Sequence, residues 1–483
     1  MRTAVQSEDD EFTIPPHSTK QINIITKAYS AVKKPWRTID EELIARQALV
    51  QQWTNNLILE TPDPVLNTMF SLAKIRASEN IFQSKLGLIH SPGGGRYYVG
   101  IWANDQAEYV SPLFPYLGYE IGNESAINCY RAFAKEINPE FTKLPYAFEV
   151  EGLRPPAPID RGDAAMIAYG ASQFVLANGD KKVAKELWEL IEWCLEYNHR
   201  QLNSAGVVQS ESDEMEGRIE TGDANLSTSA LYYGALELAV DLAADLGEPK
   251  SKVKQYVQRK NALAKAIEKY FGATVEGLAT YRYYDGHTNL RHWICLPLVV
   301  GIFDRSEATT EALFDRLWSE TGGVHVEKNS ANPQVSEIFW DRGTLYALRG
   351  TFLAGATERS LEKLQQYSQE RLLGERAPYA VEAYPEGNMA HLSAESGLYC
   401  RIFTEGMFGI VPTGLQRFKM TPRLPQGWDQ MALRKVKAFG GNFDVEVSRK
   451  ERQLEVILRD ADSEQVITTK VIDAGATTRF NFK

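Results

Sequence analysis

The chain has 483 residues, of which 43% are hydrophobic and 24% are charged, as in an ordinary soluble globular protein. Its formal net charge of -10 argues against nucleic acid or an anionic membrane as the main partner. This length predicts two or three domains, unless most of the chain forms one large helical toroid.

The N-terminal region, residues 1–37, is predicted to be a short β segment. In "EFTIPPHSTKQINIITK", Phe12 and Ile14, and then Ile22 and Ile24, follow the strand period of two around a Pro-Pro turn. Two strands are too few to fold alone, so we expect them to pack elsewhere or to belong to a larger β-sandwich. The region shows no hydrophobic signal-peptide core, and the sequence leaves the cytoplasm, the periplasm and the extracellular space open.

Residues 38–418 carry the period of helices. Apolar residues form one stripe in "KKVAKELWELIEWCLEYN" and another in "SALYYGALELAVDLAADLGEP", which ends at Gly247 and Pro249. Further helical segments are read near 40–60, 64–80, 105–117, 124–136, 162–177, 250–270, 307–319, 341–356, 359–373 and 394–408. About a dozen helices in consecutive pairs predict a mainly α fold, an (α/α)6 toroid whose long loops build a cleft at one end.

The last part of the chain, residues 419–483, is predicted to be a small antiparallel β domain. Its segments alternate apolar and polar residues, with the apolar positions at Phe443, Val445 and Val447, at Leu454, Val456 and Leu458, and at Phe480 and Phe482.

An acidic loop, "SESDEMEGR", interrupts the helical region. It places Glu211, Asp213, Glu214 and Glu216 within seven residues and ends at Arg218. Crowded carboxylates raise one another's pKa, so one of them can stay protonated near neutral pH and act as a proton donor. Hydrolysis of a glycosidic bond needs such a donor and a second carboxylate across the bond. The alternative interpretation is a solvated loop or a helix N-cap.

Other loops carry motifs that resemble known enzymes. "SPGGGRYYVGIWANDQAEY" contains Trp102 and Asp105, "FWDRGTLYAL" contains Trp340 and Arg342, and "VEAYPEG" contains Glu382. With the acidic loop they resemble, in the same order, the motifs of trehalases, family 63 processing α-glucosidases and amylo-α-1,6-glucosidases, which are six-hairpin glycoside hydrolases. The stretch "FTEGMFGIVPTGLQRFKMTPRLPQGW" is similar to the junction between toroid and β domain in α-L-rhamnosidases.

The resemblance implies an exo-acting, inverting glycoside hydrolase that needs no cofactor or metal and acts on an α-linked glucoside or oligosaccharide. Its general acid falls in the loop 210–218, at Glu214, with Asp213 as the second choice and Glu216 as the third. Its general base falls in the loop 380–387, at Glu382, with Glu386 in reserve. The two carboxyl groups of an inverting enzyme lie roughly 6.5–9.5 Å apart.

The resemblance also implies a set of substrate-binding residues: Trp102, Asp105, Arg218, Trp340, Arg342, Tyr384 and Glu386. From the residues alone, Trp102 and Trp340 can equally be core aromatics, and Asp105 can be a helix N-cap.

Three other functions stay open at this point. A polysaccharide lyase on the same toroid would use Tyr284, His287 or His391 together with an arginine. A phosphorylase would use phosphate in place of water, and an inactive relative would only bind carbohydrate. The four cysteines lie far apart and are expected to be free thiols, and the spacing of the histidines does not favour zinc. The oligomeric state stays open.

Overall fold

The computed structural model describes residues 13–20, 38–92, 100–149, 159–373, 383–384 and 393–482. The chain divides into two compact units, Met1–Gln52 and Trp53–Lys483, and each is considered by itself. In the first unit, residues 13–20 form a loop with a turn. Helix α1 (Ile39–Asn55) starts there with a capping box, in which Thr38 N donates to Glu41 Oε2 at 2.7 Å and Glu41 N donates to Thr38 Oγ1 at 3.2 Å. Phe12, Ile22 and Ile24 lie outside the described residues, so the N-terminal strands stay a prediction.

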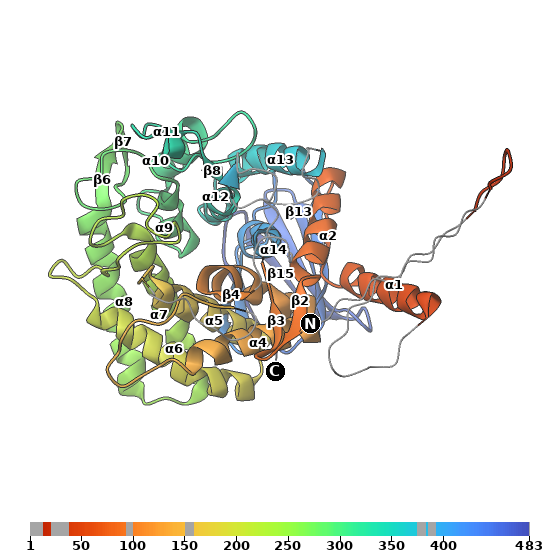
Figure 1. The fold of residues 1–483 in the computed structure, drawn as a ribbon, viewed down its shortest axis with the longest axis horizontal. Coiled ribbons are helices and arrows are strands. Elements are labelled where there is room, and N and C mark those ends of the chain that lie inside the picture. The colour runs from red at the N-terminus through yellow and green to blue at the C-terminus, as the bar shows by residue number, and fades with distance from the viewer. Residues whose placement is uncertain are drawn as a thin grey trace. The chain divides into compact units, whose positions relative to one another are not determined.

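In the second unit, helices alternate along the chain between an outer and an inner set (Figure 1). The outer set is α2 (Pro64–Ser78), α4 (Glu120–Ala134), α6 (Lys181–Arg200), α8 (Lys250–Phe271), α10 (Ser306–Glu311) and α13 (Thr357–Leu373). The inner set is η1 (Ala103–Val110), α5 (Asp163–Asn178), α7 (Leu226–Leu246), α9 (Leu296–Val299), α12 (Asp341–Leu353) and α14 (Ser393–Arg401). Each inner helix contacts the next one and α14 contacts η1, so the inner set closes a ring.

The sequence explains which helices lie inside. Helix α5 is buried along nearly its whole length, and beyond Asp163 it carries no charged residue. Helix α8 is rich in lysine and buries one narrow stripe, formed by Tyr256, Leu263, Ile267 and Phe271. A helix that is apolar on all sides belongs in the interior, and an amphipathic one covers it.

Many helix limits agree with the sequence prediction, but the predicted helices at 105–117, 307–319 and 394–408 each contain a π-helical segment. The end of α7 at Gly247 is confirmed, with a left-handed φ of 86° at that glycine. The predicted helix at 105–117 is instead a π-helix, η1, followed by a 3-10 turn, η2 (Ser111–Leu113), and one α-helical turn, α3 (Phe114–Leu117). Pro112 and Pro115 lack the N–H groups that a regular helix would use there. Short helical turns also occur at η3 (His292–Cys295), η4 (Ala312–Arg316), α11 (Pro333–Ser336) and η5 (Ile402–Met407).

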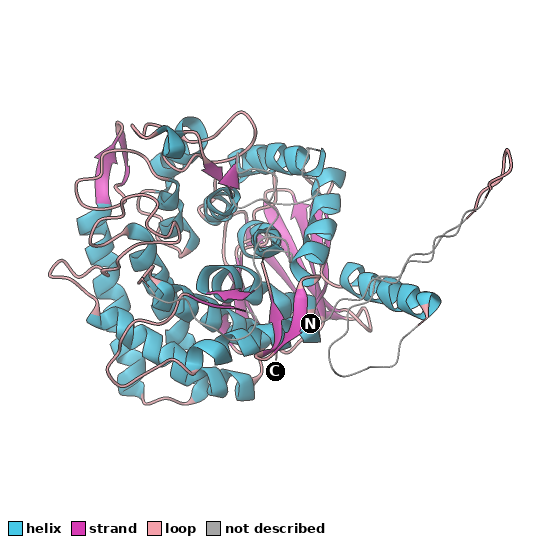
Figure 2. Cartoon of the chain, in the orientation of Figure 1, coloured by secondary structure: helices cyan, strands magenta, loops and turns pink. Residues whose placement is uncertain are grey.

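The C-terminal part consists of two antiparallel sheets (Figure 2). The larger has the order β1-β12-β13-β14-β15, formed by Ile58–Glu60, Gln430–Val436, Phe443–Lys450, Gln453–Asp460 and Val466–Asp473. The smaller has the order β10-β11-β16, formed by Ile410–Gly414, Arg417–Met420 and Thr478–Asn481. The predicted alternation of β13 and β14 is confirmed, because Phe443, Val445, Val447, Leu454, Val456 and Leu458 are all buried. The limits of the three predicted domains stay predictions.

Four two-stranded antiparallel sheets lie in the helical part. They are β2–β3 (Ile81–Ser84, Gly87–His90), β4–β5 (Gly100–Trp102, Ala147–Glu149), β6–β7 (Gly272–Val275, Leu278–Tyr281) and β8–β9 (Phe339–Trp340, Ala383–Tyr384). Among the described helices, none is both long and apolar enough to cross a membrane.

An aromatic core stabilises the C-terminal sheets. The ring of Phe418, which is fully buried, lies 4.8 Å from that of Phe439, 5.7 Å from Phe443 and 5.2 Å from Phe480. Phe418→Ala is expected to lower the free energy of unfolding by about 3–5 kcal/mol, since it leaves a cavity among these rings. Urea unfolding measures the loss, and Val471→Ala on the exposed side of β15 should change stability by less than about 1 kcal/mol. Equal losses in the two variants would contradict this account of the core.

Candidate active site

Three of the expected site residues, Asp105, Glu214 and Arg342, meet at the end of the ring where the inner helices begin. Arg342 is the second residue of α12, and its guanidinium donates to Glu395 Oε1 from Nε at 3.1 Å and from Nη2 at 2.7 Å. The same Nη2 lies 3.4 Å from Asp105 Oδ1 in η1, and Nη1 lies 3.7 Å from Glu214 Oε2. Arg342, Glu395, Asp105 and Glu214 thus form one buried group, which we call the Arg342 cluster.

Within this cluster, Glu214 is the carboxyl group best placed to hold a proton. Its side chain is 1% exposed, and neither of its oxygens accepts a hydrogen bond from the described residues. Burial, and next the charge of Glu108, raise its pKa well above the ordinary value, against the opposing effect of Arg342. A raised pKa favours the protonated form of this carboxyl group, which is the form that a proton donor needs.

Glu108 is a second buried carboxyl group, and the sequence did not single it out. It follows Asp105 by three residues in η1, and Tyr346 Oη donates to its Oε1. Burial raises the pKa of Glu108 to about 7, although Tyr346, Arg349 and Arg401 lower it. The spacing of three from Asp105 is the signal that could have drawn attention to it.

The raised pKa of Glu108 predicts a specific pH dependence of stability. Between its ordinary pKa near 4.5 and its folded pKa of about 7, the folded protein holds a proton that the unfolded chain has lost. The folded state therefore loses stability as the pH rises through this window, by roughly 3 kcal/mol. Glu108→Gln removes this contribution, so its stability relative to the parent protein is expected to be more favourable at pH 8 than at pH 5. Urea unfolding at both pH values measures the difference, and a pH-independent difference would rule out the raised pKa.

The other carboxylates of the acidic loop lie outside the Arg342 cluster. Asp213 is buried, but it accepts from Tyr283 Oη at 2.5 Å and from Met215 N at 2.8 Å. Burial, opposed by these hydrogen bonds, raises the pKa of Asp213. Glu216 is exposed, and its Oε1 lies 3.1 Å from Arg161 Nη1. Glu211 is exposed as well and pairs with Lys143 at 2.8 Å.

Aromatic side chains border the cluster. Trp340 is 1% exposed, and the guanidinium of Arg342 lies 4.9 Å from its ring. The half-exposed guanidinium of Arg218 lies 5.8 Å from the same ring. Trp102 ends β4 directly before η1 and is partly buried. Trp340 also packs with Met215 in a small apolar core, so it has a structural role as well.

The predicted base, Glu382, directly precedes strand β9 in the chain. Glu382 and Glu386 lie outside the described residues, and for Tyr384 only the backbone is described. The strand β9 pairs with β8, with Ala383 opposite Trp340 and Tyr384 opposite Phe339. Strand β8 ends two residues before Arg342, so the pairing places the backbone of Ala383 beside the strand that leads into the cluster.

The residues proposed for a lyase form a different group. His287 Nε2 lies 3.0 Å from Glu327 Oε2, and Arg291 Nη2 lies 2.7 Å from the same oxygen. Tyr284 stacks on His287 at 4.6 Å, and His391 lies outside the described residues. Arg291 is thus already occupied by a carboxylate, which leaves it poorly placed to neutralise a uronate. In the described part of the chain, no group of three or more His, Cys, Asp or Glu residues could hold a metal ion.

Comparison with known proteins identifies the fold. No protein-family model matches the sequence, and no curated protein matches it. A sialidase structure matches with a TM-score of 0.64 at 13% identity, over 89% of this chain and 42% of that one. A GH78 family rhamnosidase of Bacillus sp. GL1 matches with a TM-score of 0.60 at 13% identity, over 84% and 42%. This chain has the fold of these glycosidases.

The likeness extends to an enzyme with another named activity. A putative kojibiose phosphorylase from the human microbiome matches with a TM-score of 0.54 at 10% identity, over 92% of this chain and 66% of that one. The chain spans less than half the length of the sialidase and the Bacillus rhamnosidase. At these identities the comparison concerns the fold, and the chemistry has to be argued from the site.

Proposed function

We propose that this chain is an exo-acting, inverting glycoside hydrolase of the six-hairpin type, with its ring of helices forming an (α/α)6 toroid. The observation that carries the proposal is the Arg342 cluster, in which a buried carboxyl group, Glu214, has a strongly raised pKa. The cluster lies where inner helices begin, as expected for a site built by the loops at one end of a toroid.

In the proposed reaction, Glu214 gives its proton to the glycosidic oxygen while the bond from that oxygen to the anomeric carbon breaks. Glu382 takes a proton from a water molecule, whose oxygen attacks the anomeric carbon from the opposite face. Glu214 ends ionised and Glu382 protonated, and exchange with solvent restores both. Because the side chain of Glu214 is 1% exposed, substrate binding has to open the site far enough for the glycosidic oxygen to reach it.

The other predicted residues have supporting roles in this proposal. Arg342 balances the buried charges of Asp105 and Glu395 and so fixes their positions. Asp105 would accept hydrogen bonds from hydroxyl groups of the terminal sugar, and Trp102 and Arg218 would border the pocket together with Tyr384 and Glu386. An α-linked glucoside is the expected substrate, and the Bacillus rhamnosidase of the same fold makes an α-L-rhamnoside the natural alternative to test.

The stereochemical outcome tests the proposal. Nitrophenyl α-glucoside and α-L-rhamnoside are expected to release, in the first minutes, a sugar of the opposite anomeric configuration, because water attacks the face opposite the leaving group. Proton NMR during the reaction distinguishes the two anomers before they equilibrate. Release of the starting anomer would contradict inversion, and the absence of turnover on a broad panel of glycosides would favour a protein that only binds carbohydrate.

Phosphorolysis is the second candidate, because a putative kojibiose phosphorylase shares the fold. Phosphate would then replace water as the attacking group, and the reaction would produce a sugar phosphate. Hydrolysis predicts the same rate with and without inorganic phosphate. A strict requirement for phosphate would replace the hydrolase proposal with this one.

A further inference from the structure

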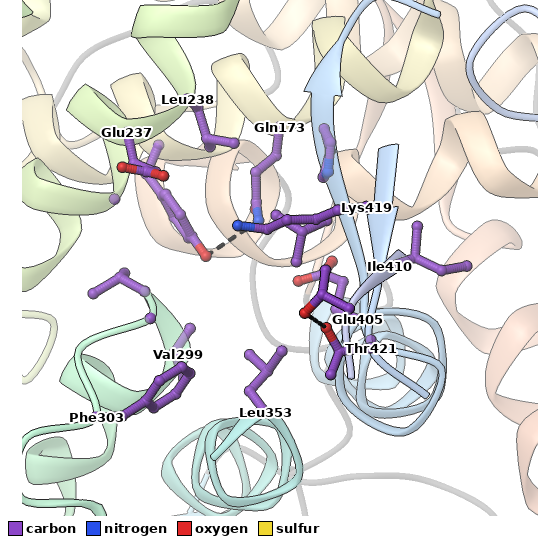
Figure 3. A pocket seen from close by; sticks show the side chains of 18 of the residues that line it. Gln173, Glu237, Leu238, Val299, Phe303, Leu353, Glu405, Ile410, Lys419 and Thr421 are labelled. Carbon is purple, nitrogen blue, oxygen red and sulfur yellow. Dashed lines mark hydrogen bonds between the residues drawn. The ribbon is translucent and has the colours of Figure 1, made fainter. Parts of the chain in front are cut away.

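A cavity of about 290 Å³ lies toward the ends of the inner helices opposite the Arg342 cluster (Figure 3). Leu353, the last residue of α12, lines it, whereas Arg342 is near the start of the same helix. At 1.5 Å per residue, these two positions are roughly 16 Å apart along the axis. Strands β10 and β11 contribute Ile410 and Lys419 to the wall, so the cavity lies between the helical ring and the smaller sheet.

The acidic side chains of this cavity are already paired. Glu405 accepts from Arg349 Nη1 at 2.8 Å and from Arg401 Nε at 2.5 Å. Glu237 Oε2 accepts from Lys260 Nζ at 2.6 Å. Neither carboxylate therefore requires a cation from a ligand.

The basic side chains of the cavity, unlike the acidic ones, have no ion-pair partner among the described residues. Lys419, Thr421 and Arg423 are spaced by two along an extended segment, and all three line the cavity. Within the described part of the chain, neither Lys419 nor Arg423 forms an ion pair. Arg423 donates from Nη2 to the Leu353 carbonyl at 2.7 Å, and its Nε is buried without an acceptor. Desolvation lowers the pKa of Arg423, and no neighbouring charge offsets that effect.

The remaining wall suits the non-ionic part of a small molecule. Figure 3 shows Val299, Leu353 and Phe303 across the cavity from Gln173 and Glu237. Phe303 is 42% exposed and gives this wall an apolar surface that solvent reaches. A volume of about 290 Å³ is at the lower end of the range for ligand pockets, which points to a molecule of monosaccharide size.

From these observations we propose that this cavity binds a small polar molecule carrying a carboxylate or a phosphate group, with Lys419 and Arg423 as its charge partners. The anionic group supplies an ion-pair partner for both cations, and the hydroxyl of Thr421, which lies between them in sequence, pairs with Thr477 Oγ1 at 2.8 Å. This site is separate from the Arg342 cluster, and the inference holds whether or not the chain hydrolyses glycosides.

Methyl NMR on the full chain tests the proposal without any turnover. The methyl groups of Ile410, Val299 and Leu353 report on the cavity. Three probes differ in charge: D-glucose is neutral, D-glucuronate carries a carboxylate, and glucose 6-phosphate carries a phosphate. We expect at least one of the two anions to shift these resonances saturably, with D-glucose binding at least about tenfold more weakly.

Variants locate the binding site. Lys419→Met and Arg423→Met should each weaken the anion at least about tenfold, while Arg452→Met, in an exposed turn of the larger sheet, should leave binding unchanged. A folded Lys419→Met or Arg423→Met protein that retains full affinity would overturn the proposal. Binding of D-glucose as tight as that of both anions, or no response of these methyl groups to either anion, would also overturn it.

Discussion

Glu214→Gln is expected to lower kcat on a glycoside with a poor leaving group, such as a disaccharide, by about 10²–10⁴-fold. The amide has the shape of the protonated carboxyl group but cannot supply a proton to the leaving oxygen. The kcat on a nitrophenyl glycoside should fall much less, because nitrophenolate leaves without protonation. The fold should survive, since both oxygens of Glu214 lack hydrogen-bond donors in the described part of the chain. Steady-state kinetics on the two substrate classes measure the contrast.

Two neighbouring substitutions serve as controls. Glu216→Gln removes an exposed carboxylate from the same loop and should leave kcat within a few fold of the parent value. Asp213→Asn alters a buried carboxyl group that accepts a hydrogen bond from Tyr283, so its main effect should be on stability. If Asp213→Asn shows the leaving-group dependence and Glu214→Gln does not, the general acid is Asp213 and the assignment made here is wrong.

Arg342→Met should cost about 3–5 kcal/mol of stability, because Glu395 and Asp105 would remain buried without their cation. The deficit should shrink on acidification, since protonation removes a buried charge that has lost its arginine partner. Urea unfolding at neutral and acidic pH measures both effects. Because Asp105 and Glu395 also lose their positions, activity should fall with stability.

Arg218→Met is the matched control for this change. Arg218 contacts the same ring, Trp340, but its side chain is 47% exposed. Its replacement should change stability by less than about 1 kcal/mol. A similar loss in the two variants would show that the aromatic contact, and not the buried ion pairs, stabilises this part of the fold.

Segments with a strong period were predictable from the sequence. The amphipathic stripe of α6 and the alternation of β13 and β14 show in the residues which side faces the interior, and the structure confirms them. The inner segment His292–Val299 was missed because all of its residues are buried. A segment that is buried on every side has no polar face, so its sequence shows no helical period. The π-helical form of Ala103–Val110 could not be predicted either, because its apolar residues are spaced as in an ordinary α-helix.

The candidate site was predictable in part. The motifs pointed to Asp105, Glu214, Trp340 and Arg342, which the structure brings together, and to Trp102, which ends the strand before Asp105. The choice between Asp213 and Glu214 could not come from sequence, because adjacent residues differ only in the direction that the folded backbone gives them. Glu395 was missed because its partner, Arg342, is distant in the chain and no local pattern links them.

The proton on Glu214 is the central claim, and infrared difference spectroscopy at pH 7 tests it directly. Subtracting the spectrum of Glu214→Gln from that of the parent protein isolates the carboxyl group of this residue. The account predicts a protonated C=O band that is lost in the variant and disappears only at high pH. An ionised carboxylate band at pH 7 would contradict it, because Glu214 would then have no proton to give to a leaving oxygen.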